Sequence, residues 1–129
     1  MAKRERILVV DDEPSIRKYL QTLLEVDGYE VETIGTGAEA IELLKTGQRP
    51  DFVILDVLMP EMNGLDALKQ MMAVDRTLSV IMLSCSNEVG TVVEAIRLGA
   101  HDYLTKPFEK GELDVAMLKC RQKRELRCV

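Results

Sequence analysis

The stretch Ile-Leu-Val-Val-Asp-Asp-Glu-Pro at residues 7–14 is the part of the sequence that most constrains the fold. Four aliphatic residues in a row are typical of a strand that is covered on both faces, as in a parallel sheet. Three acidic residues then interrupt the run, and Pro14 suits the first turn of a helix. Apolar residues recur at helical spacing up to Gly28, namely Ile16, Leu20, Leu23 and Leu24. These residues predict a buried strand, a polar turn and an amphipathic helix.

The same alternation continues along the chain. Further strands are predicted from short apolar runs at residues 31–34, 52–55, 80–83 and 103–104. Segments with helical periodicity separate them: one ends at Gly47, one opens near Gly64, one runs from about Asn87 to Gly99, and the last begins near Gly111. Strand and helix alternating in this way imply a parallel sheet with right-handed crossovers and helices on both faces. The expected fold class is α/β, with a single doubly wound five-stranded sheet.

Length and composition limit the class of protein further. A chain of 129 residues fits one domain, and a hydrophobic share of 47% is that of an ordinary globular protein. The net charge of -5 argues against direct contact of this segment with nucleic acid. No run approaches the roughly 20 apolar residues that a membrane span requires. The three cysteines lack the spacing of a disulfide or metal framework, so we expect a cytoplasmic location.

Polar residues follow the predicted strands at their carboxyl ends. Asp11 and Asp12 follow the first strand, Asp56 the third, Ser84 the fourth and Lys106 the fifth. In open parallel sheets, sites form outside the carboxyl ends of the strands. Residues far apart in sequence are therefore expected to converge at one edge of the sheet.

The chemistry of these side chains points to a phosphoryl group and a divalent cation. Carboxylates at one edge repel each other unless a cation or a proton intervenes, and hard oxygen ligands open to water favour Mg²⁺. Lys106 offers a compact positive charge for a phosphoryl oxygen, and Ser84 offers a hydroxyl donor. A carboxylate beside Mg²⁺ and a lysine can act as a nucleophile and form an acyl phosphate. A single Asp after a strand is more often a cap or turn residue, but five such positions at four strand ends favour a site.

Three segments carry a family resemblance. The sequence at residues 9–14 (Val-Val-Asp-Asp-Glu-Pro), at 55–64 (Leu-Asp-Val-Leu-Met-Pro-Glu-Met-Asn-Gly) and at 99–108 (Gly-Ala-His-Asp-Tyr-Leu-Thr-Lys-Pro-Phe) resembles receiver domains of two-component response regulators. The resemblance covers nearly the whole chain, and residues 1–129 are expected to form one receiver domain. It implies a flavodoxin-like three-layer sandwich with five helices and the strand order 2-1-3-4-5.

The resemblance also implies a role for individual residues. Asp56 matches the phosphoacceptor, Ser84 the switch hydroxyl, Tyr103 the switch aromatic, and Lys106 the lysine that accompanies the phosphoacceptor. Three more positions match the Mg²⁺ site: Asp12 as a direct ligand, Asp11 mainly through water, and Leu58 through its backbone carbonyl. Lys106-Pro107 matches the family's cis peptide bond. Mg²⁺ is the one cofactor implied.

The mechanism that the resemblance implies has two states. The phosphohistidine of a sensor histidine kinase donates its phosphoryl group to Asp56, Ser84 moves toward a phosphoryl oxygen, and Tyr103 turns inward. The surface of the fourth helix, fifth strand and fifth helix then changes shape for a partner, which could be a second copy in a homodimer. Such a domain is a signalling phosphoacceptor that catalyses only its own phosphorylation and dephosphorylation, and not an enzyme in the ordinary sense.

Two subclasses remain within the receiver interpretation. The chain could be a stand-alone regulator that acts through protein contacts, or the amino-terminal part of a transcriptional regulator whose output domain is absent. Residues 110–129 look like a fifth helix that runs into a linker. The run at residues 102–108 is also similar to receivers of enhancer-binding activators, which favours the second subclass.

Two interpretations from other classes of protein are weaker. Gly-Thr-Gly-Ala-Glu-Ala at residues 35–40 resembles a dinucleotide-binding motif, with Asp56 about 20 residues further on. That motif normally follows the first strand of its unit, and it leaves the other polar strand-end residues without a role. A magnesium-dependent aspartyl phosphatase of the haloacid-dehalogenase type requires a second Asp two residues after the nucleophile. That position is Leu58 here.

Overall fold

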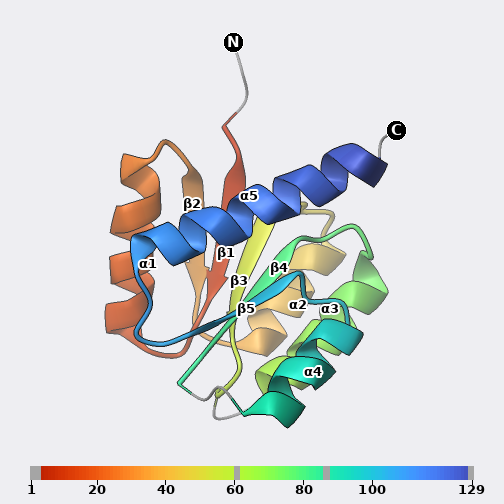
Figure 1. The fold of residues 1–129 in the computed structure, drawn as a ribbon. Coiled ribbons are helices and arrows are strands. Elements are labelled where there is room, and N and C mark those ends of the chain that lie inside the picture. The colour runs from red at the N-terminus through yellow and green to blue at the C-terminus, as the bar shows by residue number, and fades with distance from the viewer. Residues whose placement is uncertain (1–3, 60–61, 86–87, 128–129) are drawn as a thin grey trace.

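The computed structural model describes residues 4–59, 62–85 and 88–127. Within them, strands and helices alternate along the whole chain (Figure 1). The strands are β1 (Arg6–Val10), β2 (Glu30–Ile34), β3 (Phe52–Asp56), β4 (Val80–Ser84) and β5 (Asp102–Thr105). The helices are α1 (Pro14–Val26), α2 (Gly37–Lys45), α3 (Gly64–Val74), α4 (Val89–Arg97) and α5 (Lys110–Arg127).

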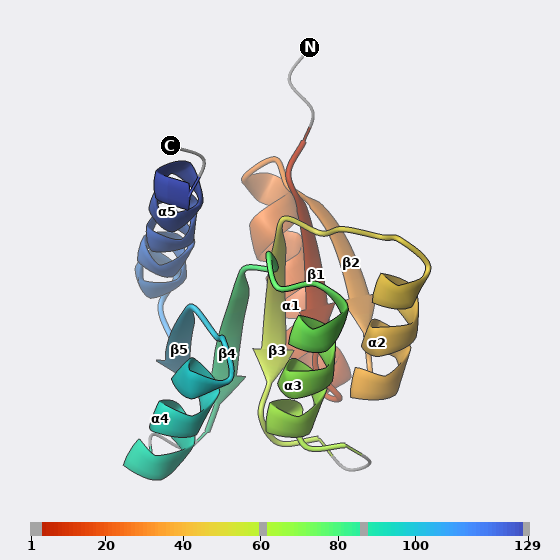
Figure 2. The same cartoon turned by 90° about the vertical axis from the view of Figure 1, so that its right-hand side faces the viewer.

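The strands form one parallel sheet. Its order is β2-β1-β3-β4-β5, and every neighbouring pair is parallel. The predicted α/β fold class and strand order are therefore confirmed. Because every pair is parallel, the carboxyl ends of the strands lie at one edge of the sheet, which is the lower edge in Figures 1 and 2.

Two layers of helices cover the sheet. Helices α1 and α5 lie on one face, and α2, α3 and α4 lie on the other (Figure 2). Alternate residues of each strand serve the two cores: Leu8 and Val53 face α2 and α3, whereas Ile7 and Phe52 face α1 and α5. Because β3 and β4 are buried along their whole length, their sequences are almost entirely apolar.

The observed elements differ from the predicted ones mainly at their ends. The central strands run one residue further than predicted, so Asp56 and Ser84 are the last residues of β3 and β4 and not the first of a turn. The edge strand β5 has four residues, whereas only the apolar pair at residues 103–104 was predicted. The prediction was too short because only one of the four residues is buried, so the others need not be apolar. Helix α4 begins at Val89, and the predicted start near Asn87 lies outside the described residues.

Helix α5 is fastened to the amino-terminal end of the sheet by two arginines. The Arg121 guanidinium donates to Glu5 Oε1 at 2.7 Å and lies 5.2 Å from the centre of the Phe52 ring. The Arg124 guanidinium lies 4.7 Å from the centre of the same ring. Side-chain contacts therefore hold α5 to the domain as far as Arg124.

Among the described helices, none combines the length and apolar character that crossing a bilayer requires.

Candidate functional site

Three carboxylates meet at the carboxyl edge of the sheet. Asp11 and Asp12 directly follow β1, and Asp56 ends the neighbouring strand β3. One carboxylate oxygen from each of the three residues lies within 4.8 Å of the other two. Asp11 and Asp56 are buried, whereas Asp12 is half-buried. The structure therefore brings together residues that are 45 positions apart in sequence.

Lys106 lies in the same pocket. Its ammonium Nζ is 2.9 Å from Asp11 Oδ2 and 3.5 Å from Asp56 Oδ2, and the side chain is only 10% exposed. The Lys106 backbone N–H donates to the Ser84 carbonyl at 2.7 Å, which fixes the lysine beside the end of β4. Burial lowers the pKa of Lys106, but the hydrogen bond and charge of Asp11 outweigh it and leave the pKa raised. The predicted cis Lys106-Pro107 bond is confirmed.

The negative charges of Asp11 and Asp12 near Asp56 are only partly balanced by the positive charge of Lys106. Burial and the charge of Asp11 raise the pKa of Asp56 to about 6, and Lys106 and the Leu58 N–H offset this only in part. The Leu58 N–H donates to Asp56 Oδ1 at 3.3 Å. A pocket of crowded carboxylates with hard oxygen donors fits a small divalent cation, which would relieve the repulsion.

Replacing Asp56 by Asn is expected to stabilise the metal-free protein at high pH. A pKa of about 6 against the ordinary 3.8 corresponds to a cost of about 3 kcal/mol for the ionised form. The raised pKa means that the folded state holds the proton more tightly than the unfolded state. Stability is therefore lost as pH rises from about 4 to 6. We expect Asp56→Asn to raise the free energy of unfolding by on the order of 2 kcal/mol at pH 8, and by much less at pH 4.

Urea unfolding in EDTA, followed by circular dichroism because the chain has no Trp, measures this difference. Asp66→Asn is the matched control, since Asp66 is exposed on α3 and is expected to change stability by no more than about 0.5 kcal/mol. An equal gain for Asp56→Asn at both pH values would contradict the assigned pKa.

The remaining predicted site residues lie around this pocket. Ser84 is fully buried at the end of β4, one residue beyond Leu83, which is the register partner of Asp56. Leu58 is 59% exposed, and it contacts Asp56 through its backbone N–H. Tyr103 is half-buried on β5 and packs against the core beneath α2, α3 and α4. It lies outside the cluster of charges.

Two residues of the pocket were not singled out from the sequence. A Cβ atom on Gly64 would lie 2.1 Å from the Asp56 carbonyl oxygen, and the Gly64 N–H donates to the Val57 carbonyl at 2.7 Å. Arg17 Nη1 donates to the Asp11 carbonyl at 2.6 Å. The sequence signal for Gly64 was a glycine at the start of the helix that follows Asp56. The signal for Arg17 was a long donor side chain one turn into the helix that follows Asp11.

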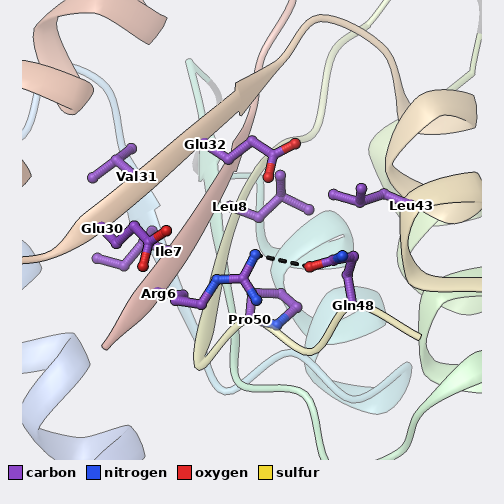
Figure 3. Close-up of a pocket in the computed structure, with 9 residues that line it drawn as sticks. All are labelled: Arg6, Ile7, Leu8, Glu30, Val31, Glu32, Leu43, Gln48 and Pro50. Carbon is purple, nitrogen blue, oxygen red and sulfur yellow. Dashed lines mark hydrogen bonds between the residues drawn. The ribbon is translucent and has the colours of Figure 1, made fainter. Parts of the chain in front are cut away.

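A pocket at the opposite end of the sheet is unrelated to these residues. It has a volume of about 210 Å³ and lies beside the amino-terminal ends of β1 and β2 (Figure 3). Arg6 donates across it to Gln48 Oε1 at 2.8 Å. Its lining residues are Arg6, Ile7, Leu8, Glu30, Val31, Glu32, Leu43, Gln48 and Pro50. Sites in open parallel sheets form at the carboxyl ends, so this pocket is a gap beside an edge strand.

The glycine motif at residues 35–40 does not form a nucleotide cradle. It follows the edge strand β2 and not β1. A Cβ on Gly35 would lie 3.2 Å from Arg17 Nη1, and one on Gly37 would lie 2.9 Å from Ala67 Cβ. Side chains of the protein itself therefore lie against both glycines, and the position of the motif after an edge strand does not support the dinucleotide interpretation.

A doubly wound α/β domain with an acidic pocket and a buried lysine at its carboxyl edge has the architecture of a signalling receiver. The family model described as "Response regulator receiver domain" matches residues 7–118. The chain belongs to the response regulator receiver family. It is accordingly a signalling phosphoacceptor of two-component systems and not an enzyme acting on a separate substrate, which excludes the phosphatase interpretation.

Curated relatives include proteins of two sizes. The chain is 39% identical over 131 residues to the regulatory protein AtoC of Escherichia coli, a match covering 98% of this chain but 28% of AtoC. It is 40% identical over 116 residues to the chemotaxis protein CheY of Thermotoga maritima, covering 89% of this chain and 96% of CheY. The chain therefore corresponds to nearly all of one relative and to about a quarter of the other.

Solved structures agree with this assignment. A response regulator receiver domain protein from Clostridium thermocellum superposes with a TM-score of 0.86 at 31% identity, covering 95% of this chain and 98% of that one. The response regulator TrrA from Thermotoga maritima, solved in complex with Mg²⁺-BeF, gives a TM-score of 0.81 at 34% identity. That match covers 90% of this chain and 98% of TrrA.

Proposed function

We propose that Asp56 accepts a phosphoryl group from the phosphohistidine of a sensor histidine kinase, with Mg²⁺ as the cofactor. The observation that carries this proposal is the position of Asp56. It is a buried carboxylate at the carboxyl edge of the sheet, with the Lys106 ammonium 3.5 Å away and two further carboxylates within reach. Carboxylates placed in this way form covalent phosphoryl intermediates in phosphoryl transfer.

The transfer exchanges one bond to phosphorus for another. An Asp56 carboxylate oxygen forms the new P–O bond while the P–N bond of the phosphohistidine breaks and its electron pair returns to the imidazole ring. The Leu58 N–H holds Asp56 Oδ1 and leaves Oδ2 toward Lys106. Lys106 then supplies positive charge to the transferred group, which bears most of the developing negative charge.

The residues that would hold Mg²⁺ are Asp12 and Asp56 directly, Asp11 mainly through water, and Leu58 through its backbone carbonyl. When bound, Mg²⁺ supplies charge neutralisation and orients phosphoryl oxygens. Asp11 holds Lys106 more closely than Asp56 does, at 2.9 Å against 3.5 Å. The unphosphorylated protein therefore keeps the lysine in the pocket before any phosphoryl group arrives.

Ser84 and Tyr103 are the proposed switch residues. The Ser84 hydroxyl donates to a phosphoryl oxygen in the phosphorylated state, and Tyr103 turns further inward on β5. Phosphorylation shifts this equilibrium only by the difference in its interactions with the two states. The α4, β5 and α5 surface then changes shape, and it carries exposed apolar residues suited to a partner: Val89, Val93, Ile96, Val115 and Leu118.

Acetyl phosphate tests the proposal without knowledge of the kinase. We expect intact-mass spectrometry to find one phosphoryl group per chain in the presence of Mg²⁺ and almost none in EDTA. Borohydride reduction followed by peptide mapping should place the group on Asp56. Equal labelling with and without Mg²⁺, or a label on another residue, would contradict the proposed function.

We further propose that residues 1–129 form the receiver of a transcriptional regulator, in the cytoplasm, with α5 leading toward an output domain. The similarity to AtoC over the whole chain supports this. The acidic receiver itself makes no contact with nucleic acid, and it could pair with a second copy through α4, β5 and α5. The alternative is a stand-alone receiver, which the full-length similarity to CheY supports. The complete open reading frame distinguishes them.

A further inference from the structure

The turn between β2 and α2 lies next to Asp11, because the Asp11 N–H donates to the carbonyl of Ile34, the last residue of β2. Arg17, in the second turn of α1, reaches back between this turn and the end of β1. We propose that Arg17 is a positioning residue that fixes the Asp11–Asp12 segment for Mg²⁺ binding. This inference rests on the proposed function, because it assigns Arg17 a part in the same site.

The first observation is how the Asp11 peptide is held. Arg17 Nη1 donates to the Asp11 carbonyl at 2.6 Å, and the Asp11 N–H donates to the Ile34 carbonyl at 3.1 Å. The Asp11 carbonyl belongs to the peptide bond that leads into Asp12. Arg17 therefore restrains the backbone at the point where the two carboxylates diverge.

The second observation is that both carboxylate oxygens of Asp11 are already engaged. Oδ1 accepts from the Glu13 N–H at 2.9 Å, and Oδ2 accepts from Lys106 Nζ at 2.9 Å. These bonds need the backbone in one orientation, because a rotation of the Asp11–Asp12 peptide would break them together. A charge-assisted bond from Arg17 to the peptide carbonyl therefore supports the whole arrangement.

The third observation is the absence of a side chain at Gly35. A Cβ there would lie 3.2 Å from Arg17 Nη1, which is tighter than ordinary van der Waals contact. The glycine leaves room for the guanidinium between the turn and Asp11. Supporting residues of this kind orient the ligands of metal sites without touching the metal.

Electrostatics and positioning predict opposite effects of removing Arg17. Its positive charge at the Asp11 peptide opposes the binding of a cation nearby, so a purely electrostatic role predicts tighter Mg²⁺ binding in its absence. A positioning role predicts weaker binding, because the carboxylates lose their arrangement. The sign of the change in Mg²⁺ affinity therefore separates the two.

Isothermal titration calorimetry with MgCl₂ on wild type, Arg17→Met, Arg17→Lys and Lys18→Met is the experiment. Met keeps the apolar length of Arg17 without a donor, and Lys restores one donor and the charge. Lys18 is exposed on the same helix turn and serves as the charge-matched control. Circular dichroism in EDTA checks that each variant is folded, and the Mg²⁺ dependence of labelling by acetyl phosphate gives a second measurement.

We expect the Mg²⁺ dissociation constant of Arg17→Met to rise on the order of tenfold, with partial recovery in Arg17→Lys and no weakening in Lys18→Met. The Mg²⁺ concentration for half-maximal labelling should rise with it, whereas the rate at saturating Mg²⁺ should fall less. Unchanged or tighter Mg²⁺ binding in Arg17→Met would overturn the inference. A wild type that binds Mg²⁺ but takes up no phosphoryl group would instead overturn the proposed function, and one that binds no Mg²⁺ would overturn both.

Discussion

Asp56→Asn is expected to gain no phosphoryl group from acetyl phosphate and Mg²⁺ under conditions that label the wild type. An amide oxygen carries no full negative charge and is a poor nucleophile, so the P–O bond does not form. The substitution changes almost no volume, and the Asn carbonyl can still accept from the Leu58 N–H that now contacts Asp56 Oδ1 at 3.3 Å. The expected loss is complete and not partial.

Misfolding would not explain such a loss, because the same substitution is expected to stabilise the metal-free protein at pH 8. Asp66→Asn, exposed on α3, should be labelled at the wild-type rate. Intact-mass spectrometry of the three proteins after equal incubation makes the comparison. A phosphoryl adduct of undiminished size on Asp56→Asn would refute the assignment of the phosphoacceptor.

The convergence of Asp11, Asp56 and Lys106 could be predicted because it depends on two coarse properties of the chain. Apolar runs revealed the buried strands β1, β3 and β4, and parallel strands must end at the same edge. The strand order came from the family resemblance, since hydrophobic periodicity alone does not order strands within a sheet. The edge strand β5 gave a weaker signal because half-buried residues alternate less clearly.

The contacts inside the pocket could not be predicted in the same way. Lys106 lies closer to Asp11 than to Asp56, and Arg17 bonds to a backbone carbonyl, because of side-chain conformations that several packed elements determine together. The types of residue in a sequence do not predict a difference of 0.6 Å between two ion-pair distances. The role of Gly64 was hidden for a related reason: a glycine that opens a helix looks like a cap until the neighbouring backbone is known.

Gly64→Ala is expected to be the most destabilising single-methyl change at the site. The added Cβ would lie 2.1 Å from the Asp56 carbonyl oxygen and 2.7 Å from Val57 Cα. Both are backbone atoms of the segment that leaves β3, and they cannot move aside as the end of a flexible side chain can. We expect the free energy of unfolding to fall by at least about 3 kcal/mol, as for severe overpacking in a core.

The same movement should disturb phosphorylation, because displacing the Asp56 peptide also displaces its carboxylate and the Leu58 N–H.

Gly90→Ala is the matched control: nothing lies within 4 Å of a Cβ at this exposed position of α4. Alanine is the better helix former, so this control should gain up to about 1 kcal/mol. Urea unfolding by circular dichroism, together with labelling by acetyl phosphate, compares the two. The two substitutions add the same methyl group but should change stability in opposite directions. A free energy of unfolding for Gly64→Ala within about 0.5 kcal/mol of the wild-type value would show that the close approach of α3 to the Asp56 backbone does not require a glycine.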